Sequence, residues 1–516
     1  MDKLKNLQNP SWSKDWSLTA LSKEAKKVLC QCSKLADPEP KDDVQEIIQK
    51  SNEFPIDFPI ETVRLKTLKN NVSVEILKKN IASTYPVVHE RVLRLMAEFL
   101  SYKNIHGSSI EKELYESMTI PEFIDRILKK RAMTFMSRFD KYMLITGERG
   151  NNGWEEIGTP KQKSPLTLDN CLSYDELKLS SMVYVSSHTV CINDGARKNK
   201  GVENDDNIEQ NAVIIGVIGP RFQREARMDN EDILITEKQN KPENGFGRVD
   251  ETNKKSLWRK LWADFYEKKN YTYEEAKSNL SHQPSEKKKL KKDEKLYTDT
   301  LVSVGKDGAV FDNCTYHKRL NIITDSSLLE AEARGAREEK SVFLNIIGCG
   351  LGVWKISPHQ NDVYVLSIVE RIRAMLQCDA ISHVTDVNFA YIKASKSLKS
   401  YFGTNKDGIL ETFIPSKEHP NGGIRVYLED REPSSKLAKQ HAGKLLVMQY
   451  PWDGNAHPGN EFWIGKLGSS GDPAAACSTQ ISELHNAHIN SNASGLHTKV
   501  VSQSGLVSLA EYCRSL

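Results

Sequence analysis

Three alternating glycines follow a predicted buried strand in the run Gly348-Cys-Gly-Leu-Gly-Val-Trp-Lys355. Glycines in such a place let the backbone approach a ligand and aim several N–H groups at an anion. The spacing differs from the dinucleotide G-x-G-x-x-G motif, and the G-K-[ST] ending of a P-loop is absent. The run therefore predicts a diphosphate cradle, and the alternative is a tight turn that packs closely on a neighbouring strand. The cradle would consist of Gly348, Gly350, Leu351, Gly352 and Val353.

A second polar block follows another predicted strand and reads Pro451-Trp-Asp-Gly-Asn-Ala-His-Pro-Gly-Asn-Glu-Phe-Trp463. Short polar side chains between aromatic rings suit hydrogen bonds to a ribose or base beside a stacking surface. The alternative is an Asx-rich structural turn. We take Asp453 and Glu461 as candidate catalytic carboxylates, and Asn455 and Asn460 as candidate ligand-binding residues.

A third block, residues 219–232, also begins where a predicted buried strand ends. Its first arginine, Arg221, is a candidate for holding a phosphate, because guanidinium groups bind phosphate oxygens in pairs. Glu225 and Asp229 are candidate acid/base groups. The alternative is a salt-bridged surface turn.

Two more segments place polar residues near predicted strand ends. Asn193 and Asp194 would serve as hydroxyl or amide partners of a ligand. Asp386 is a further candidate catalytic carboxylate, which would meet a ligand amino group or a water, or cap a loop. Ser187 beside His188 suggests a nucleophile, but the G-x-S-x-G elbow that exposes such a serine is absent.

Continuous apolar runs predict the elements that position these blocks. Runs of this length indicate strands buried on both faces, as in a layered α/β sheet. In open α/β sheets ligands bind at the carboxyl ends of the strands, and the first three blocks each begin at such an end. The predicted strands are 182–186, 211–219, 341–347, 381–392 and 445–450, and the predicted helices include 257–268, 328–339 and 363–378.

The first 145 residues have helix-like apolar spacing, for example from Val87 to Phe99. A Gly-, Asn- and Pro-rich stretch at 147–165 then suggests a boundary. We predict an α-helical N-terminal domain over 1–150 and an α/β domain over 166–516. The second domain would carry a polar, Lys-rich insertion at about 250–300.

Composition excludes several classes of protein. The chain has 516 residues, with 72 Lys and Arg against 69 Asp and Glu, and a net charge of +3 is no electrostatic footprint for nucleic acid. No apolar run is long enough to span a bilayer, and the first residues lack the apolar core of a secretory signal. The nine cysteines are scattered without metal-ligand spacing, so we expect no metal and reduced thiols in a cytoplasmic compartment.

Several blocks, taken in order, resemble a known family once grouped as domain of unknown function 4804, which includes MavL-like effectors of bacterial type IV secretion systems. The resemblance covers roughly residues 180–490. It rests on SSHTVCINDG, GVIGPRFQREARMD, NKPENGFG, IIGCGLGVWK, YPWDGNAHPGNEFW and SGDPAAACST.

This resemblance implies a macrodomain-like, three-layer α/β/α core that binds ADP-ribose as ligand or substrate, with no other cofactor. It implies an ADP-ribosyl hydrolase acting on a modified protein such as ADP-ribosylated ubiquitin, in the cytoplasm or, after type IV secretion, in that of a host cell. The chain has Gln223 where the family usually has Glu, and paired glutamates typical of glycohydrolases are not visible. The alternatives are therefore a non-catalytic ADP-ribose reader or adaptor, and a different nucleotide-phosphate hydrolase.

Overall fold

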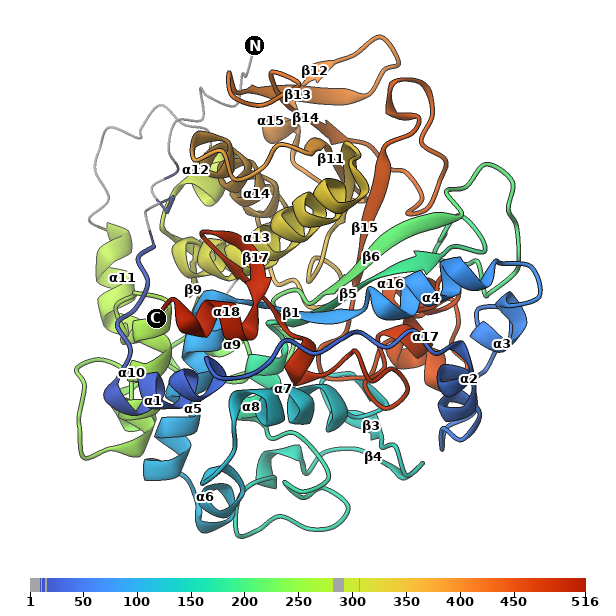
Figure 1. Cartoon of the computed structure of the whole chain (residues 1–516). Helices are drawn as coiled ribbons and strands as arrows, with labels where there is room; N and C mark the ends of the chain where they lie inside the picture. The colour runs from blue at the N-terminus through green and yellow to red at the C-terminus, as the bar shows by residue number, and fades with distance from the viewer. Residues whose placement is uncertain (1–9, 11, 14–15, 282–291, 306) are drawn as a thin grey trace.

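A large mixed sheet crosses the molecule and is flanked by helices (Figure 1). The computed structural model describes residues 10, 12–13, 16–281, 292–305 and 307–516, so part of the Lys-rich run lies outside the described residues. Within this part of the chain the main sheet has 11 strands. In spatial order they are β12 (Gly403–Thr404), β13 (Leu410–Pro415), β14 (Gly423–Leu428), β11 (Val384–Ala390), β10 (Val342–Ile347), β15 (Leu445–Pro451), β6 (Asn211–Val217), β5 (Val183–Val190), β1 (Tyr85–His89), β16 (Lys499–Ser502) and β17 (Gly505–Ser508).

Five neighbouring strands, β14, β11, β10, β15 and β6, run parallel, so their carboxyl ends share one edge of the sheet. Strand β5 pairs antiparallel with β6 and therefore ends at the opposite edge. Almost every residue of β6, β10 and β15 is buried, which is the reason that these parallel strands are continuous apolar runs. The α/β class and the predicted strands are confirmed, while the macrodomain likeness and the division into domains stay predictions.

Helices cover both faces of the sheet. The helices are α1 (Lys23–Cys32), α2 (Val44–Asn52), α3 (Leu65–Leu68), α4 (Val74–Ala82), α5 (Glu90–His106), α6 (Ser109–Tyr115), α7 (Ile120–Lys129), α8 (Tyr174–Ser180), α9 (Asn230–Ile233), α10 (Lys254–Phe265), α11 (Tyr273–Ser281), α12 (Lys292–Thr298), α13 (Asn313–Glu338), α14 (Gln360–Gln377), α15 (Lys396–Lys399), α16 (Gly471–Ala476), α17 (Ile481–Leu484) and α18 (Leu509–Arg514). Two smaller sheets consist of β2 (Thr134–Met136), β3 (Lys141–Met143) and β4 (Arg149–Gly150), and of β7 (Leu234–Ile235), β9 (Ala309–Asp312) and β8 (Leu301–Val304).

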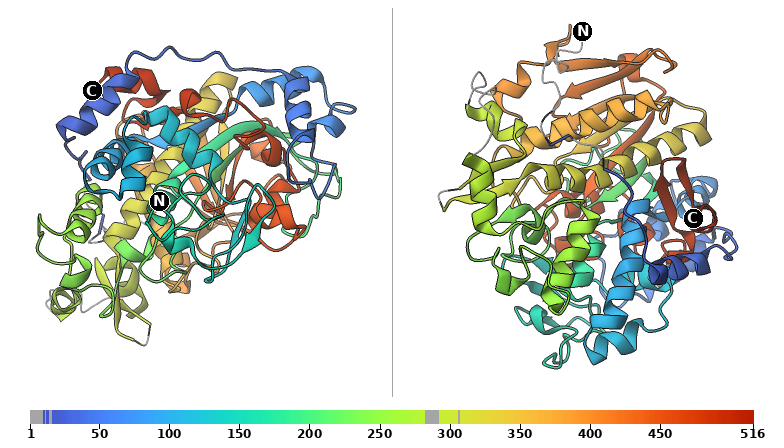
Figure 2. Two further views of the ribbon diagram at one scale, coloured as in Figure 1. Left: turned by 90° about the horizontal axis from the view of Figure 1, so that it is seen from below. Right: turned by 90° about the vertical axis from the view of Figure 1, so that its left-hand side faces the viewer.

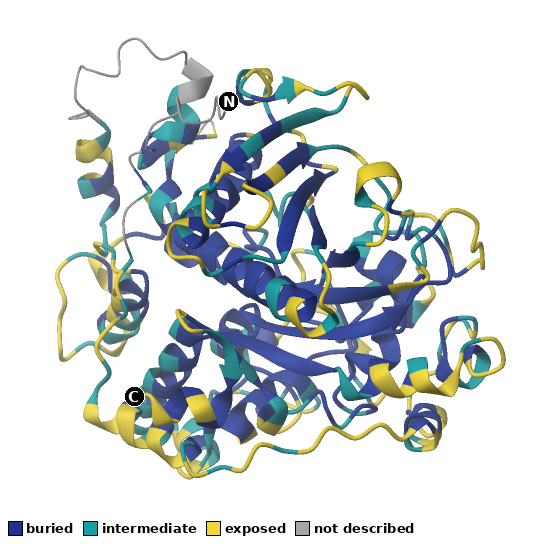
Figure 3. Ribbon diagram, turned by 45° about the horizontal axis from the view of Figure 1, so that its top comes forward, coloured by how far each residue is buried: buried dark blue, intermediate teal, exposed yellow. Residues whose placement is uncertain are grey.

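The two faces can be assigned from neighbouring serines of β5. The Ser186 hydroxyl donates to Glu330 of α13 at 2.6 Å, whereas the Ser187 hydroxyl lies 3.0 Å from the His485 ring that follows α17. Because successive side chains of a strand point to opposite faces, α13 covers one face and α17 the other. Buried segments accordingly occupy the centre of the molecule, and exposed ones its loops and outer helices (Figure 3).

Helix α13 begins at Asn313, with Asp312 as its N-cap, well before the predicted start at residue 328. The prediction was wrong because buried polar residues interrupt the apolar pattern of this helix. Arg319, for example, is fully buried and pairs with Asp229 inside the core. Burial of such paired side chains removes the one-sided apolar stripe by which a helix is recognised in a sequence.

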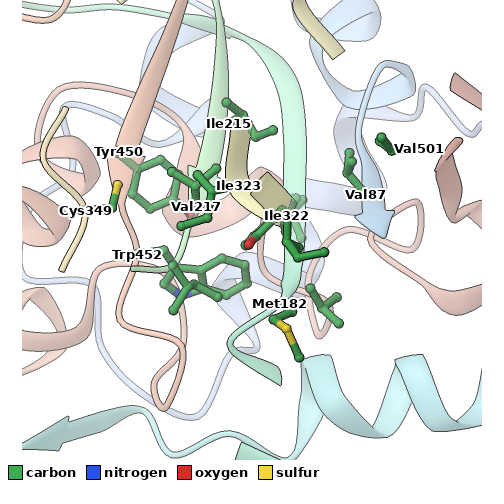
Figure 4. Close-up of a cluster of buried hydrophobic side chains, with 14 of the residues drawn as sticks. Val87, Met182, Ile215, Val217, Ile322, Ile323, Cys349, Tyr450, Trp452 and Val501 are labelled. Carbon is green, nitrogen blue, oxygen red and sulfur yellow. The ribbon is translucent and has the colours of Figure 1, made fainter. Parts of the chain in front are cut away.

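The N-terminal segment contributes a strand to the main sheet, which corrects the prediction of a helix starting at Val87. Tyr85–His89 forms β1 between β5 and β16, and α5 starts only at Glu90. Val87 lies with Val501 of β16 and with Ile322 and Ile323 of α13 in one apolar cluster (Figure 4). Adjacent β-branched residues favour a strand, and the contact with the sheet overrides the helix-like spacing.

Helix α1 contacts α18, so an early helix of the chain packs against the last one (Figure 2). No helix among the described residues is long and apolar enough to cross a membrane. All nine cysteines are described, and no disulfide joins any of them.

Candidate active site at the carboxyl edge of the sheet

The three predicted blocks meet where β6, β15 and β10 end. The backbones of the first and third blocks are in direct contact, because a Cβ atom on Gly219 would lie 2.2 Å from both the Cys349 carbonyl carbon and the Gly350 nitrogen. The second block follows β15, which lies between β6 and β10. This edge therefore collects the glycine loop, Arg221 and the Asp453 turn.

The glycine loop has two different halves. Gly350 has φ +75, and a Cβ atom there would lie 2.7 Å from the Pro220 carbonyl oxygen, so the first half is a tight turn packed on a neighbour. A Cβ atom added to Gly352 would have nothing within 4 Å, and Val353 is 84% exposed. The packed turn accounts for Gly350, and only the second half is open to a ligand.

Alanine substitutions should separate these two roles. We expect Gly219→Ala to destabilise the protein by roughly 1–3 kcal/mol, because its methyl group would collide with rigid backbone. Gly352→Ala should leave the unfolding temperature unchanged, since its methyl group meets open space. Thermal unfolding of the two variants measures the difference, and equal midpoints would contradict the close packing of Gly219.

Asp453 is a half-buried carboxyl at the start of the second block. Its Oδ1 accepts the Asn455 N–H at 3.2 Å and its Oδ2 accepts the Asn460 side-chain amide at 3.0 Å. Burial raises the pKa of Asp453 to about 6, although the nearby Arg221 guanidinium acts to lower it. A carboxyl with a pKa of about 6 can exchange protons near neutral pH, which suits general acid/base chemistry.

Asn460 positions Asp453, and both N–H groups of its side-chain amide are used within the protein. Its Oδ1 accepts the Phe135 N–H at 2.9 Å, and its Nδ2 donates to the Phe135 carbonyl at 3.3 Å as well as to Asp453. The side chain thus joins the second block to β2. Glu461, the next residue, is half-buried and accepts a hydrogen bond from Ser470 at 3.3 Å.

Arg221 is a buried cation with an unused donor. It is 3% exposed, and its guanidinium carbon lies 5.1 Å from the ring centre of Phe135 and 5.6 Å from that of Trp354. Its Nη2 donates to Gln223 at 3.2 Å, but its Nε finds no acceptor among the residues that the structure describes. Asn455 is 1% exposed, and its Nδ2 also has no hydrogen-bond acceptor among the described residues. Buried donors without partners are costly, so these two favour a ligand rich in acceptor oxygens.

Two residues near Asp453 were missed by the sequence reasoning. Asp472, 2% exposed, accepts the backbone N–H of Asp453, and burial raises its pKa well above the ordinary value. Arg131 lies 4.0 Å from the ring centre of Trp452, and burial lowers its pKa to about 9. Asp472 lies in the block SGDPAAACST, which the family resemblance had already marked. Arg131 had no comparable signal.

The two candidate carboxylates of the third block lie in surroundings that differ from those of Asp453. Glu225 is exposed and pairs with Lys238 at 2.9 Å. Asp229 is 3% exposed, and both of its carboxylate oxygens accept hydrogen bonds. One accepts the backbone N–H of Arg221 at 2.8 Å, and the other accepts the side-chain Nε–H of Arg319 at 3.0 Å. Neither carboxylate is placed as Asp453 is.

Asn193, Asp194 and Asp386 lie toward the amino ends of the parallel strands and are not brought to this edge. Asn193 and Asp194 follow β5, whose reversed direction puts its end beside the start of β6. Their side-chain oxygens accept local backbone N–H groups at 3.0 and 2.9 Å. Asp386 lies near the start of β11 and accepts hydrogen bonds from Thr385, Tyr427 and Lys444. No group of His, Cys, Asp and Glu side chains that could hold a metal ion occurs among the described residues.

Comparison with known proteins identifies the family. A family profile described as ADP-ribosylhydrolase MavL-like matches residues 45–515. The chain is 38% identical over 502 residues to a Drosophila melanogaster protein named ADP-ribosylarginine hydrolase CG3568, an alignment that covers 95% of this chain and 92% of that protein. It is 37% identical over 477 residues to ADP-ribosylarginine hydrolase CG2909 of the same organism, with 91% and 88% coverage. The chain therefore belongs to the MavL-like ADP-ribosylhydrolase family, and it is a hydrolase acting on ADP-ribose glycosyl bonds.

Proposed function

We propose that this chain removes ADP-ribose from arginine side chains of modified proteins, with Asp453 as the catalytic carboxylate. The observation that carries the proposal is the half-buried Asp453 carboxyl, with a pKa of about 6, at the strand edge that also holds Arg221 and the glycine loop. The two fly relatives are named for hydrolysis of ADP-ribosylarginine, which supports the choice of linkage.

The diphosphate of the substrate would bind at the glycine loop and Arg221. The open half of the loop, at Gly352, can bring backbone N–H groups to an anion, and Arg221 has a buried donor without an acceptor among the described residues. Such contacts orient the distal ribose without adding charge at the reacting bond. Asn455 and Glu461 are proposed as hydrogen-bonding partners of that ribose.

Above its pKa of about 6, Asp453 is ionised and can accept a proton from a water molecule. The water oxygen then bonds to the anomeric carbon of the ribose while the carbon–nitrogen bond to the arginine breaks, through an oxocarbenium-like transition state. The proton held by Asp453 passes to the departing guanidine nitrogen. Free ADP-ribose and unmodified arginine are the products.

Release of ADP-ribose from defined substrates tests the proposal. The chain is incubated with a peptide ADP-ribosylated on arginine, with a matched peptide modified on serine, and with arginine-ADP-ribosylated ubiquitin, and mass spectrometry follows each product. We expect release from the arginine-linked peptide and little from the serine-linked one. The family resemblance suggests ubiquitin as a substrate. The incubation with arginine-ADP-ribosylated ubiquitin tests that suggestion.

Calorimetry with ADP-ribose separates the enzyme from a reader. Tight binding with no release from any substrate would support the non-catalytic alternative, and the absence of both would contradict ADP-ribose as the ligand. The comparisons favour the enzyme, because both relatives carry the name of a hydrolase.

A further inference from the structure

Asp472 lies directly behind the turn that carries Asp453. It belongs to the first turn of α16, and its carboxylate receives two backbone N–H groups of that turn, one through each oxygen. Oδ2 accepts the Asp453 N–H at 3.0 Å and Oδ1 accepts the Gly459 N–H at 2.7 Å. One side chain therefore bridges both ends of the 453–459 turn.

Close packing leaves this bridge little freedom to move. A Cβ atom on Gly471 would lie 2.5 Å from Cγ of Pro451, and one on Gly459 would lie 3.2 Å from Cβ of Ala476, so α16 is pressed against both ends of the turn. Asp472 itself is 2% exposed. Because one buried side chain holds two backbone N–H groups, it fixes both ends of the turn relative to α16.

The same turn sets the orientation of the Asp453 carboxylate. Its two oxygens are held by the N–H of Asn455 and the side chain of Asn460, which lie within and just after the bridged segment. If the turn shifts, the Asp453 carboxylate shifts with it. Misplacement of a catalytic group by about 1 Å can lower a rate by about 10²-fold.

We infer that Asp472 is a positioning residue, which acts through Asp453 by clamping both ends of its turn and does not itself touch the substrate. The inference rests on the proposed function, in which Asp453 is the catalytic carboxylate. It predicts an effect on the chemical step and not on substrate binding.

The test substitution is Asp472→Asn, which keeps the shape of the side chain but replaces one acceptor with an amide donor that faces a backbone N–H. We expect kcat for arginine-linked ADP-ribose release to fall at least about tenfold, while KM and the affinity for ADP-ribose stay within about twofold of wild type. Hydrogen exchange measured by mass spectrometry should become faster in the peptide that contains 453–459.

Glu483→Gln is the matched control. Glu483 is a carboxylate in the next helix, α17, and is 1% exposed. It accepts the backbone N–H of Leu65 at 2.7 Å, so the segment that it holds is remote in sequence from the Asp453 turn. This variant should lose stability but keep kcat and the slow exchange of the 453–459 peptide.

An unchanged kcat in Asp472→Asn, an equal loss of kcat in both variants, or unchanged exchange of the 453–459 peptide would each overturn the inference. A wild-type chain that releases no ADP-ribose from arginine would instead contradict the proposed function. The exchange measurement does not depend on activity, so the two failures can be told apart.

Discussion

Asp453→Asn is expected to lower kcat for ADP-ribose release by about 10²–10⁴-fold, the usual range for removal of a general acid/base group. The amide keeps the size of the carboxylate but cannot accept a proton from water. KM should change little, because the diphosphate contacts proposed for Arg221 and the glycine loop remain. Steady-state kinetics on an arginine-ADP-ribosylated peptide measures both constants.

The pH dependence of the wild-type enzyme checks the same assignment. Because Asp453 must be ionised to act as a base, activity should fall as the pH drops below about 6. A rate that stays constant from pH 8 to pH 4.5 would exclude Asp453 as the base.

Stability provides the control for Asp453→Asn. A carboxyl whose pKa is raised from 3.8 to about 6 by burial binds its proton more tightly in the folded protein than in the unfolded chain. Its favourable contribution is therefore complete below about pH 4 and is lost as the pH rises through about 6. The amide of the variant would carry no charge at pH 8, so the unfolding temperature should not fall there. A large drop would indicate that Asp453 has a structural role.

Asp229→Ala is expected to destabilise the fold by about 3–5 kcal/mol, since it leaves a buried cation without its partner. Arg319 is fully buried, and Asp229 is its carboxylate partner at 3.0 Å. The guanidinium also donates to the carbonyl oxygens of Ser181 and Ile218 at 2.8 and 2.9 Å, so it cannot move out to solvent without breaking these bonds. The pKa of Arg319 is raised by Asp229 although burial acts in the opposite direction, so the charge persists.

Chemical denaturation measures the free energy of unfolding of Asp229→Ala and of Glu225→Ala, two variants within one block of sequence. Glu225 is exposed, and its partner among the described residues is the exposed Lys238, so its loss should change stability by no more than about 1 kcal/mol. The double variant Asp229→Leu with Arg319→Met should recover part of the loss, because it removes both charges. Similar midpoints for Asp229→Ala and Glu225→Ala would contradict the structural role of Asp229.

The predicted strands agree with the structure wherever the chain forms the interior of the parallel sheet. β6, β10 and β15 are continuous apolar runs because helices and loops bury both of their faces. The start of α13 and the strand β1 could not be predicted in this way. In both places the deciding contacts come from distant parts of the chain, as with His89 of β1, which lies 3.3 Å from Asp325 of α13.

The amino-acid sequence alone determined which blocks of polar residues follow buried strands. The direction of each strand decided which blocks reach the carboxyl edge, because β5 runs antiparallel to β6 and carries Asn193 and Asp194 to the opposite edge. The sequence could not rank the carboxylates, because the types and local spacing of Asp453, Asp229 and Asp386 are similar. Only the tertiary structure distinguished them, through partners that are remote in sequence: Arg319 is 90 residues from Asp229, and Lys444 is 58 from Asp386. Burial and charge pairing set the chemistry of a carboxyl, and both arise only when the chain has folded.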